Sequence, residues 1–193
     1  MLSDVIRADL YRQGGLVGFK GFLKGLTYPG FRYLFVYRNA KRYRKTPLII
    51  FIKILRRRYK IKYGYEISSD AQIGKGLYLS SHFGHVVVGP IKMGDYCCLN
   101  HSVTIGRAYK NGKIGRPTIG NFVWIGTGAV IVGEINIGND VLIAPNAFVN
   151  FDVPDHSLVI GNPGKIIEKE NPTKNYINFV FDDANKHLHK TFK

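Results

Sequence analysis

Cysteine is scarce in this sequence, and long apolar runs are missing. The two cysteines, Cys97 and Cys98, are adjacent, which excludes a framework of long-range disulfides, and no Cys/His spacing typical of a zinc site occurs. The N-terminus has no signal-peptide apolar run, and no stretch approaches the roughly 20 apolar residues that span a bilayer. The cytoplasm is therefore the expected location.

Acidic residues are almost absent from the first third of the chain. Residues 1–65 carry 16 lysines and arginines but only Asp4 and Asp9, so this part has a net charge of +14, whereas residues 66–193 have +1. Such a field is expected to attract anionic lipid, a phosphate-bearing substrate or nucleic acid. No zinc finger, RRM or helix-turn-helix signature accompanies the charge, which does not favour nucleic acid.

The stretch from Ile119 to Pro154 repeats every six residues. The first and fifth positions of each hexad are apolar, and the others are mostly Gly, Asn, Asp, Thr or Pro. Helical spacing would scatter these apolar residues, and strand alternation would not reset every six residues. The period therefore predicts a mainly β solenoid of short, stacked strands. The apolar positions are Ile119, Val123, Ile125, Ala129, Ile131, Ile135, Ile137, Val141, Ile143, Ala147, Val149 and Val153.

The repeat extends backwards with interruptions. Hexads begin at Ile67, Ile73 and Leu79, after which the register slips by two residues and is expected to resume at Val87. The segment RAYKNGKIGRP then departs from the pattern and is expected to protrude as a loop. We predict three parts: a basic, partly helical N-terminal region (1–65), the coil (66–167) and a short C-terminal tail (168–193). Cys97, at a fifth position, is expected to be a small buried core residue.

The basic N-terminal region shows no six-residue period. Ser3 is the candidate N-cap of a first helix. Further on, Leu48, Ile52, Leu55 and Tyr59 share one face at helical spacing, with basic residues elsewhere around the helix. Such a segment suits an anionic membrane surface, with the protein peripheral at its inner face. It also suits a helix packed on the coil with its basic face solvated, and both interpretations stay open.

The segment EISSDAQIGKGLYLSSHFGHVVVG, Glu66 to Gly89, resembles the serine acetyltransferase branch of the hexapeptide-repeat acyltransferases. The similarity continues through LNHSVTIG and IGTGAVIVGEINIG to GNPGKII, and so covers residues 66–167. The resemblance implies a left-handed parallel β-helix with three hexads per coil, acetyl-CoA as the acetyl donor and a closed homotrimer.

The resemblance also places His82 on the catalytic histidine and Glu66 on the acid that orients it. Neutral imidazole can take the proton of an acceptor hydroxyl, and a carboxylate on the other ring nitrogen fixes the tautomer. The two residues lie 16 positions apart, close to one 18-residue coil. His85 and His101 are rivals for this role, and the alternative for His82 is a hydrogen-bonded turn residue.

Four further residues match the donor site of this family. The resemblance puts Gly126, Ala129 and Ala144 in the turns along which coenzyme A lies between subunits, and Lys165 near the end of that groove. Small side chains let a ligand approach the backbone closely, and a lysine can meet a phosphate. A glycine in a turn is equally explained by the turn alone.

Some departures point away from serine as the acceptor. The long helical domain of the family is missing, Ser81 replaces an acidic residue, and the basic loop reads Gly115-Arg116-Pro117 without its histidine. We therefore expect O-acetylation of a sugar or lipid-linked oligosaccharide in capsule, exopolysaccharide or lipopolysaccharide assembly. Serine O-acetylation and a non-catalytic β-helix binding or scaffold protein are the alternatives. The expected acceptor contacts are Ser81, His85, Asn100, His101 and Arg116.

Overall fold

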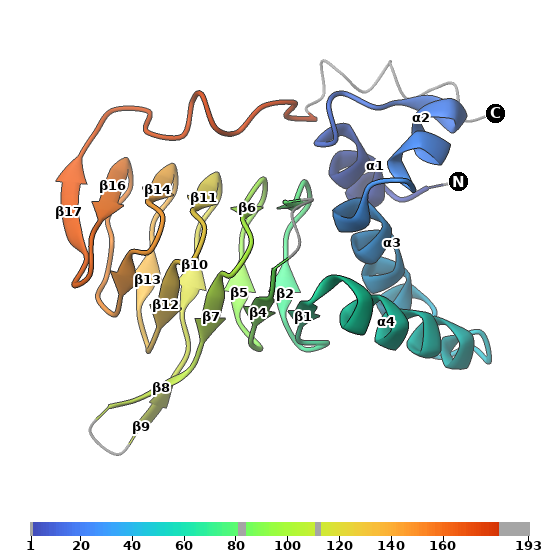
Figure 1. Ribbon diagram of the computed structural model, residues 1–193, viewed down its shortest axis with the longest axis horizontal. Coiled ribbons are helices and arrows are strands. Elements are labelled where there is room, and N and C mark those ends of the chain that lie inside the picture. The colour runs from blue at the N-terminus through green and yellow to red at the C-terminus, as the bar shows by residue number, and fades with distance from the viewer. Residues whose placement is uncertain (1, 81–83, 111–112, 182–193) are drawn as a thin grey trace.

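The computed structural model describes residues 2–80, 84–110 and 113–181, and its helices gather at one end of a long coil (Figure 1). The helices are α1 (Asp4–Tyr11), α2 (Gly18–Gly25), α3 (Pro29–Arg42) and α4 (Ile49–Tyr63). The Ser3 side chain accepts a hydrogen bond from the Ile6 amide at 3.4 Å, so the predicted N-cap of α1 is confirmed.

The remaining chain forms a parallel β-solenoid with three faces, consistent with the predicted left-handed β-helix. Sheet A contains β1 (Tyr65–Ile67), β4 (Val86–Val88), β7 (Thr104–Gly106), β12 (Val130–Val132) and β15 (Phe148–Val149). Sheet B contains β2 (Gln72–Ile73), β5 (Lys92–Met93), β10 (Thr118–Ile119) and β13 (Asn136–Ile137). Sheet C contains β3 (Tyr78–Leu79), β6 (Cys98–Leu99), β11 (Val123–Ile125), β14 (Val141–Ile143), β16 (Ser157–Ile160) and β17 (Lys165–Glu168).

The hexad columns form the core of this coil. All twelve first- and fifth-position residues from Ile119 to Val153 are at most 6% exposed. Each strand pairs with the strand one coil away, so that Trp124 lies beside Leu142 and Val130 beside Phe148. Because every coil buries its aliphatic residues against its neighbours, stability accumulates coil by coil. The predicted solenoid core is confirmed.

The register after the first interruption differs by one residue from the prediction. Ile67 pairs with Val88, not with Val87. Val86 and Val88 point into the core, whereas Val87 is 38% exposed. Alternate residues of a strand face opposite sides, so a one-residue error turns the whole strand over. The repeat therefore resumes with Val88, and Val87 is an outward residue.

The predicted loop is an antiparallel hairpin of β8 (Ala108–Lys110) and β9 (Lys113–Gly115), which projects from the coil (Figure 1). It leaves the coil after β7 of sheet A and returns at β10 of sheet B. The hairpin therefore stands on the edge between these two sheets.

The C-terminal segment returns along the coil to the helices. After β17, which is antiparallel to β16, residues 169–181 run back past the coil to α1 (Figure 1). Phe181 packs in one apolar cluster with Ala8 and Tyr96, and the Tyr96 hydroxyl donates to the Phe181 carbonyl. The N-terminal helix and the C-terminal segment of the described chain therefore pack together on the coil.

A buried ion pair joins the helices to the first coil. The fully buried Asp9 of α1 accepts hydrogen bonds from Arg38 Nε of α3 and from the Leu77 amide, each at 2.9 Å. Burial of a charge is costly without such partners. Within the described residues, none of the helices combines the length and the hydropathy that crossing a membrane requires.

Candidate active site

Turns that lead from sheet C to sheet A stack along one edge of the coil, which we call the C–A edge. It comprises the turns between β3 and β4, β6 and β7, β11 and β12, and β14 and β15. Backbone hydrogen bonds join successive turns: Gly128 N donates to the His101 carbonyl at 3.1 Å, and Asn146 N to the Thr127 carbonyl at 2.8 Å. The turns of Gly84, His101, Gly126 and Ala144 therefore lie along a single edge.

Histidines dominate the N-terminal part of this edge. His82 and Ser81 lie outside the described residues, but the adjacent Gly84 is placed. A Cβ atom on Gly84 would lie 2.8 Å from the Cβ atom of His101, so His101 of the next coil lies directly against Gly84. The His101 ring is half-buried, and its Nδ1 atom is fully buried. His85, the residue that follows Gly84, is exposed.

Glu66, the predicted orienting acid, lies on the outer face of β1. Its carboxylate forms an ion pair with Lys60 Nζ of α4 at 2.5 Å. The carboxylate also lines a cleft of about 570 Å³ between α4 and sheet A, together with Lys53, Arg56 and Arg57. Its pairing with His82 stays a prediction.

The four predicted donor-site residues differ in what they offer a ligand. A Cβ atom on Gly126 would lie 2.5 Å from Pro145 N, so the next coil already requires glycine there. Ala129 is fully buried in the core, and its amide and carbonyl groups are both used in backbone hydrogen bonds. Ala144 is half-buried, and Lys165 is exposed at the start of β17. Their contacts with coenzyme A stay predictions.

Asn100 and Arg116, two of the predicted acceptor contacts, do not present free side chains at the C–A edge. The side-chain amide of Asn100 donates to the Ile125 carbonyl at 2.8 Å and so holds two coils together. Arg116 is exposed after β9, on the edge between sheets A and B. Within a single chain the structure therefore does not bring Arg116 to the C–A edge.

Neither cysteine has the properties of a reactive thiol. Cys97 and Cys98 are buried, and burial raises the pKa of each thiol to about 12. A nucleophilic cysteine needs a lowered pKa, so neither side chain is prepared for catalysis. The prediction that Cys97 is a small core residue is confirmed.

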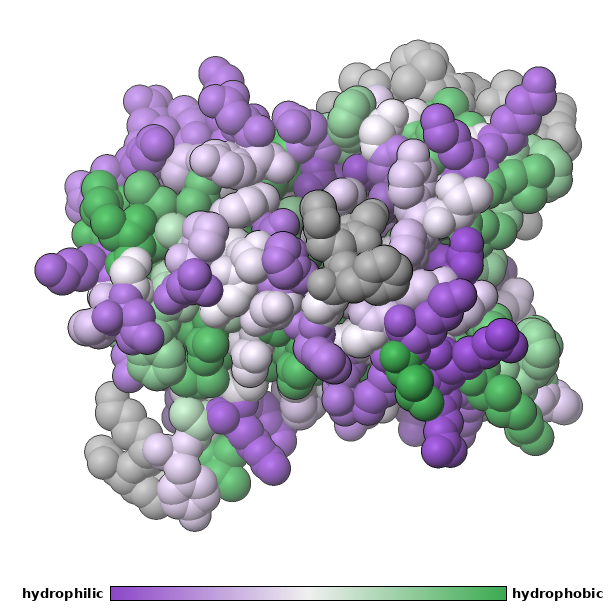
Figure 2. Space-filling model, in the orientation of Figure 1, coloured by the Kyte–Doolittle hydropathy of each residue, from purple (hydrophilic) through white to green (hydrophobic). Residues whose placement is uncertain are grey.

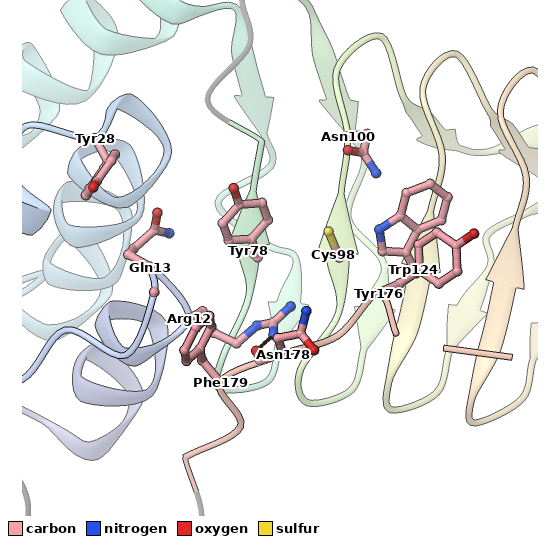
Figure 3. Close-up of a pocket in the computed structure, with 11 residues that line it drawn as sticks. Arg12, Gln13, Tyr28, Tyr78, Cys98, Asn100, Trp124, Tyr176, Asn178 and Phe179 are labelled. Carbon is pink, nitrogen blue, oxygen red and sulfur yellow. Dashed lines mark hydrogen bonds between the residues drawn. The ribbon is translucent and has the colours of Figure 1, made fainter. Parts of the chain in front are cut away.

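A cavity of about 400 Å³ that no sequence motif predicts lies on the outer face of sheet C (Figure 3). Three segments far apart in sequence form it: the end of α1, strands of sheet C and the returning C-terminal segment. The Arg12 guanidinium points between these segments and donates to the Asn178 carbonyl, and burial lowers the pKa of Arg12. Because no local motif marks such a site, only the folded chain reveals it. Its lining includes Arg12, Gln13, Tyr28, Tyr78, Cys98, Asn100, Trp124, Tyr176, Asn178 and Phe179.

Comparisons with known proteins agree on one family. Residues 116–150 match the family model "Bacterial transferase hexapeptide (six repeats)". The chain is 35% identical over 145 residues to a serine acetyltransferase of Helicobacter pylori, covering 75% of this chain and 85% of that protein. It is 34% identical over 142 residues to a serine acetyltransferase of Synechococcus elongatus, covering 74% of this chain but only 58% of that protein.

A solved structure gives the same result. The serine acetyltransferase of Brucella abortus in complex with coenzyme A aligns with a TM-score of 0.71 at 29% identity. The alignment covers 86% of this chain and 67% of that one.

The expectation of a sugar acceptor is wrong, because these relatives are serine acetyltransferases. The expectation rested on departures from the serine acetyltransferase motifs, and it placed Ser81 and Asn100 at the acceptor. The Asn100 amide is instead used inside the coil, and Ser81 lies outside the described residues. A role in polysaccharide assembly has no support in these comparisons.

Proposed function

Because the chain belongs to the serine acetyltransferases of the hexapeptide-repeat family, we propose that it transfers an acetyl group from acetyl-CoA to the hydroxyl of L-serine. The observation that carries the proposal is the C–A edge. There Gly84, two residues after the motif histidine, lies against His101, and the turns of Gly126 and Ala144 continue the same edge. A base and a donor groove on one edge are what acetyl transfer requires.

In this proposal the His82 imidazole takes the proton from the serine hydroxyl as its oxygen attacks the thioester carbonyl. The new C–O bond forms, the C–S bond breaks, and the imidazolium returns the proton to the departing thiolate of coenzyme A. Glu66 positions the imidazole and stabilises its charged form. Lys60 competes for the same carboxylate, since the two groups form an ion pair.

The donor and acceptor contacts follow from the position of each residue. Coenzyme A lies along the turns of Gly126, Ala129 and Ala144, and Lys165 meets a phosphate group. Arg116 stands on a different edge of the coil, so we propose that it binds the serine carboxylate at the C–A edge of a neighbouring subunit in a homotrimer.

An assay of free coenzyme A release with several acceptors tests this function. Acetyl-CoA with L-serine is expected to give turnover at least about tenfold above acetyl-CoA alone, with O-acetylserine detected by mass spectrometry. Glycine, which lacks the hydroxyl, and simple hexoses serve as controls. Acetyl-CoA binding without transfer to L-serine would reject the proposal and leave a non-catalytic binding protein.

A further inference from the structure

Helix α4 is apolar on two opposite faces. Its inner face packs on α3 and β1 and includes Ile52 and Tyr63, which are buried. At 100° per residue, Ile50, Ile54 and Ile61 lie together on the opposite side. They are 66%, 64% and 75% exposed, so no described element covers this isoleucine stripe.

The face predicted from the sequence as the apolar face is therefore the inner one. Ile52 and Tyr59 pack against the rest of the protein, Leu55 is half-buried, and Leu48, the N-cap of α4, is exposed. The outward isoleucine stripe was not recognised, because an aliphatic residue occurs on almost every side of this helix.

Basic side chains border the isoleucine stripe on both sides. Lys53, Arg57 and Lys60 follow one flank, and Arg58 and Lys62 the other, all of them exposed. Figure 2 shows hydrophobic and hydrophilic side chains side by side over this helix, at the lower right. Residues 41–62 contain ten lysines and arginines and no acidic residue. In the described chain, only Lys60 of the five flanking residues has an acidic partner.

A cleft opens beside one flank of the isoleucine stripe. Its volume is about 570 Å³, and its lining combines Lys53, Arg56, Arg57 and Lys60 with a single carboxylate, that of Glu66, which is paired with Lys60. Four cationic side chains around a space of this size suit the phosphodiester of a lipid headgroup, while the adjacent isoleucines suit the upper part of the acyl chains.

We propose that α4 docks on an anionic lipid bilayer, with its axis along the membrane surface. The isoleucine stripe enters the headgroup–acyl boundary, and the flanking lysines and arginines extend to the phosphates. A second copy of the chain fits less well, because the same helix would bring like charges together. Nucleic acid is a less suitable partner. Proteins that bind single-stranded nucleic acid combine positive charge with aromatic side chains that stack on the bases, whereas this surface combines positive charge with exposed isoleucines.

Co-sedimentation with lipid vesicles tests this proposal on the full chain. Vesicles of phosphatidylcholine alone are compared with vesicles containing roughly one quarter phosphatidylglycerol, over about 50 to 500 mM salt. We expect binding to the anionic vesicles that weakens with salt but does not vanish, because the apolar contribution is not screened. Equal recovery on both lipids, or none on either, would overturn the proposal.

The variants that test the proposal replace exposed residues, so we expect them to fold like the wild type. Ile54→Ser/Ile61→Ser should lower the partition onto anionic vesicles about tenfold or more, and Arg57→Ser/Arg58→Ser should reduce its salt dependence. The matched controls are Ile166→Ser/Ile167→Ser, at exposed positions of β17, and Lys169→Ser/Lys174→Ser, which should both bind like the wild type.

Two outcomes would assign the stripe to another partner. Unchanged lipid binding in the isoleucine variant, with concentration-dependent self-association lost, would indicate a second copy. Retention on polyglutamate without lipid binding would indicate an acidic protein. Transfer to L-serine is measured separately, so a negative lipid result leaves the proposed function untouched, and the reverse also holds.

Discussion

Imidazole, carboxylate and thiol groups behave differently in this coil because they differ in burial and in neighbours. The Cys97 thiol lies in the apolar core, and the Cys98 thiol is buried on the outer face of sheet C. The Glu66 carboxylate faces cationic α4, and His85 and His101 occupy turns at the C–A edge. We therefore expect reactive side chains outside the apolar core and unreactive thiols where the cysteines are buried.

His82→Ala is expected to lower kcat for acetyl transfer by about 10²-fold or more, because the general base is lost. The melting temperature should stay close to that of the wild type. Steady-state kinetics and a thermal melt measure both effects. The control is His156→Ala, which removes an exposed imidazole paired with Asp140 in the turn before β16. A folded His82 variant with most of its activity would transfer the role to His101 or His85.

Glu66→Gln is expected to lower kcat by roughly tenfold or more, with little change in KM for acetyl-CoA. The reason is that only the orientation and charge of the His82 base are affected. The control is Lys60→Met, which keeps the carboxylate and should reduce kcat less. Poor acetyl-CoA binding by the glutamine variant would instead place Glu66 in the donor site.

Neither cysteine should react with a thiol reagent in the native protein at about pH 8. A pKa of about 12 leaves roughly 10⁻⁴ of each thiol ionised, and both side chains are buried. In denaturant both thiols should react at once. Spectrophotometric thiol titration measures the difference, and rapid native labelling would contradict the burial of Cys97 and Cys98.

At the level of elements, the C-terminal segment is the part most dependent on tertiary contacts. It has no hexads of its own, yet Phe181 is buried beside Tyr11 with ring centroids 6.0 Å apart. The segment also closes the cavity of Figure 3 through Tyr176, Asn178 and Phe179. It therefore couples α1 to the outer face of sheet C.

Phe181→Ala should lower the free energy of unfolding by about 3 kcal/mol, because it leaves a cavity between α1 and the coil. Phe179→Ala is the matched control and should cost less than about 1 kcal/mol, since Phe179 is 49% exposed. Denaturant unfolding at one fixed protein concentration provides both values. Equal losses for the two variants would mean that the segment is not anchored at Phe181.

At the scale of the whole molecule, the described chain separates the groups that the proposed reaction needs. Arg116 stands on the edge between sheets A and B, whereas His85 and His101 stand on the C–A edge. A closed trimer would place one subunit's hairpin against the next subunit's edge. The oligomer would thus be part of the active site.

Light scattering should report a mass about three times the 21.8 kDa of one chain. Arg116→Ala and His82→Ala should each be nearly inactive alone. Co-expressed mixtures should regain part of the activity, because some sites then combine an intact Arg116 with an intact His82 from different subunits. No recovery in mixed trimers would place both residues in the same chain's site.

Much of the fold follows from local pattern. The hexad period dictates which residues turn inward, because each coil contacts only its neighbours, and the Ile119–Val153 columns are buried as the period predicts. The Ser3 cap, the buried Cys97 and the protruding hairpin are also readable from nearby residues.

Other features depend on contacts between distant segments, which no local period encodes. Packing against α3 and β1 decided which side of α4 faces outward, and therefore exposed the isoleucine stripe instead of Ile52. Pairing between coils decided that Val88, not Val87, points inward. The Lys60 partner of Glu66, the cavity beneath the C-terminal segment and the placement of Arg116 away from the histidines likewise arise only once the coil has closed.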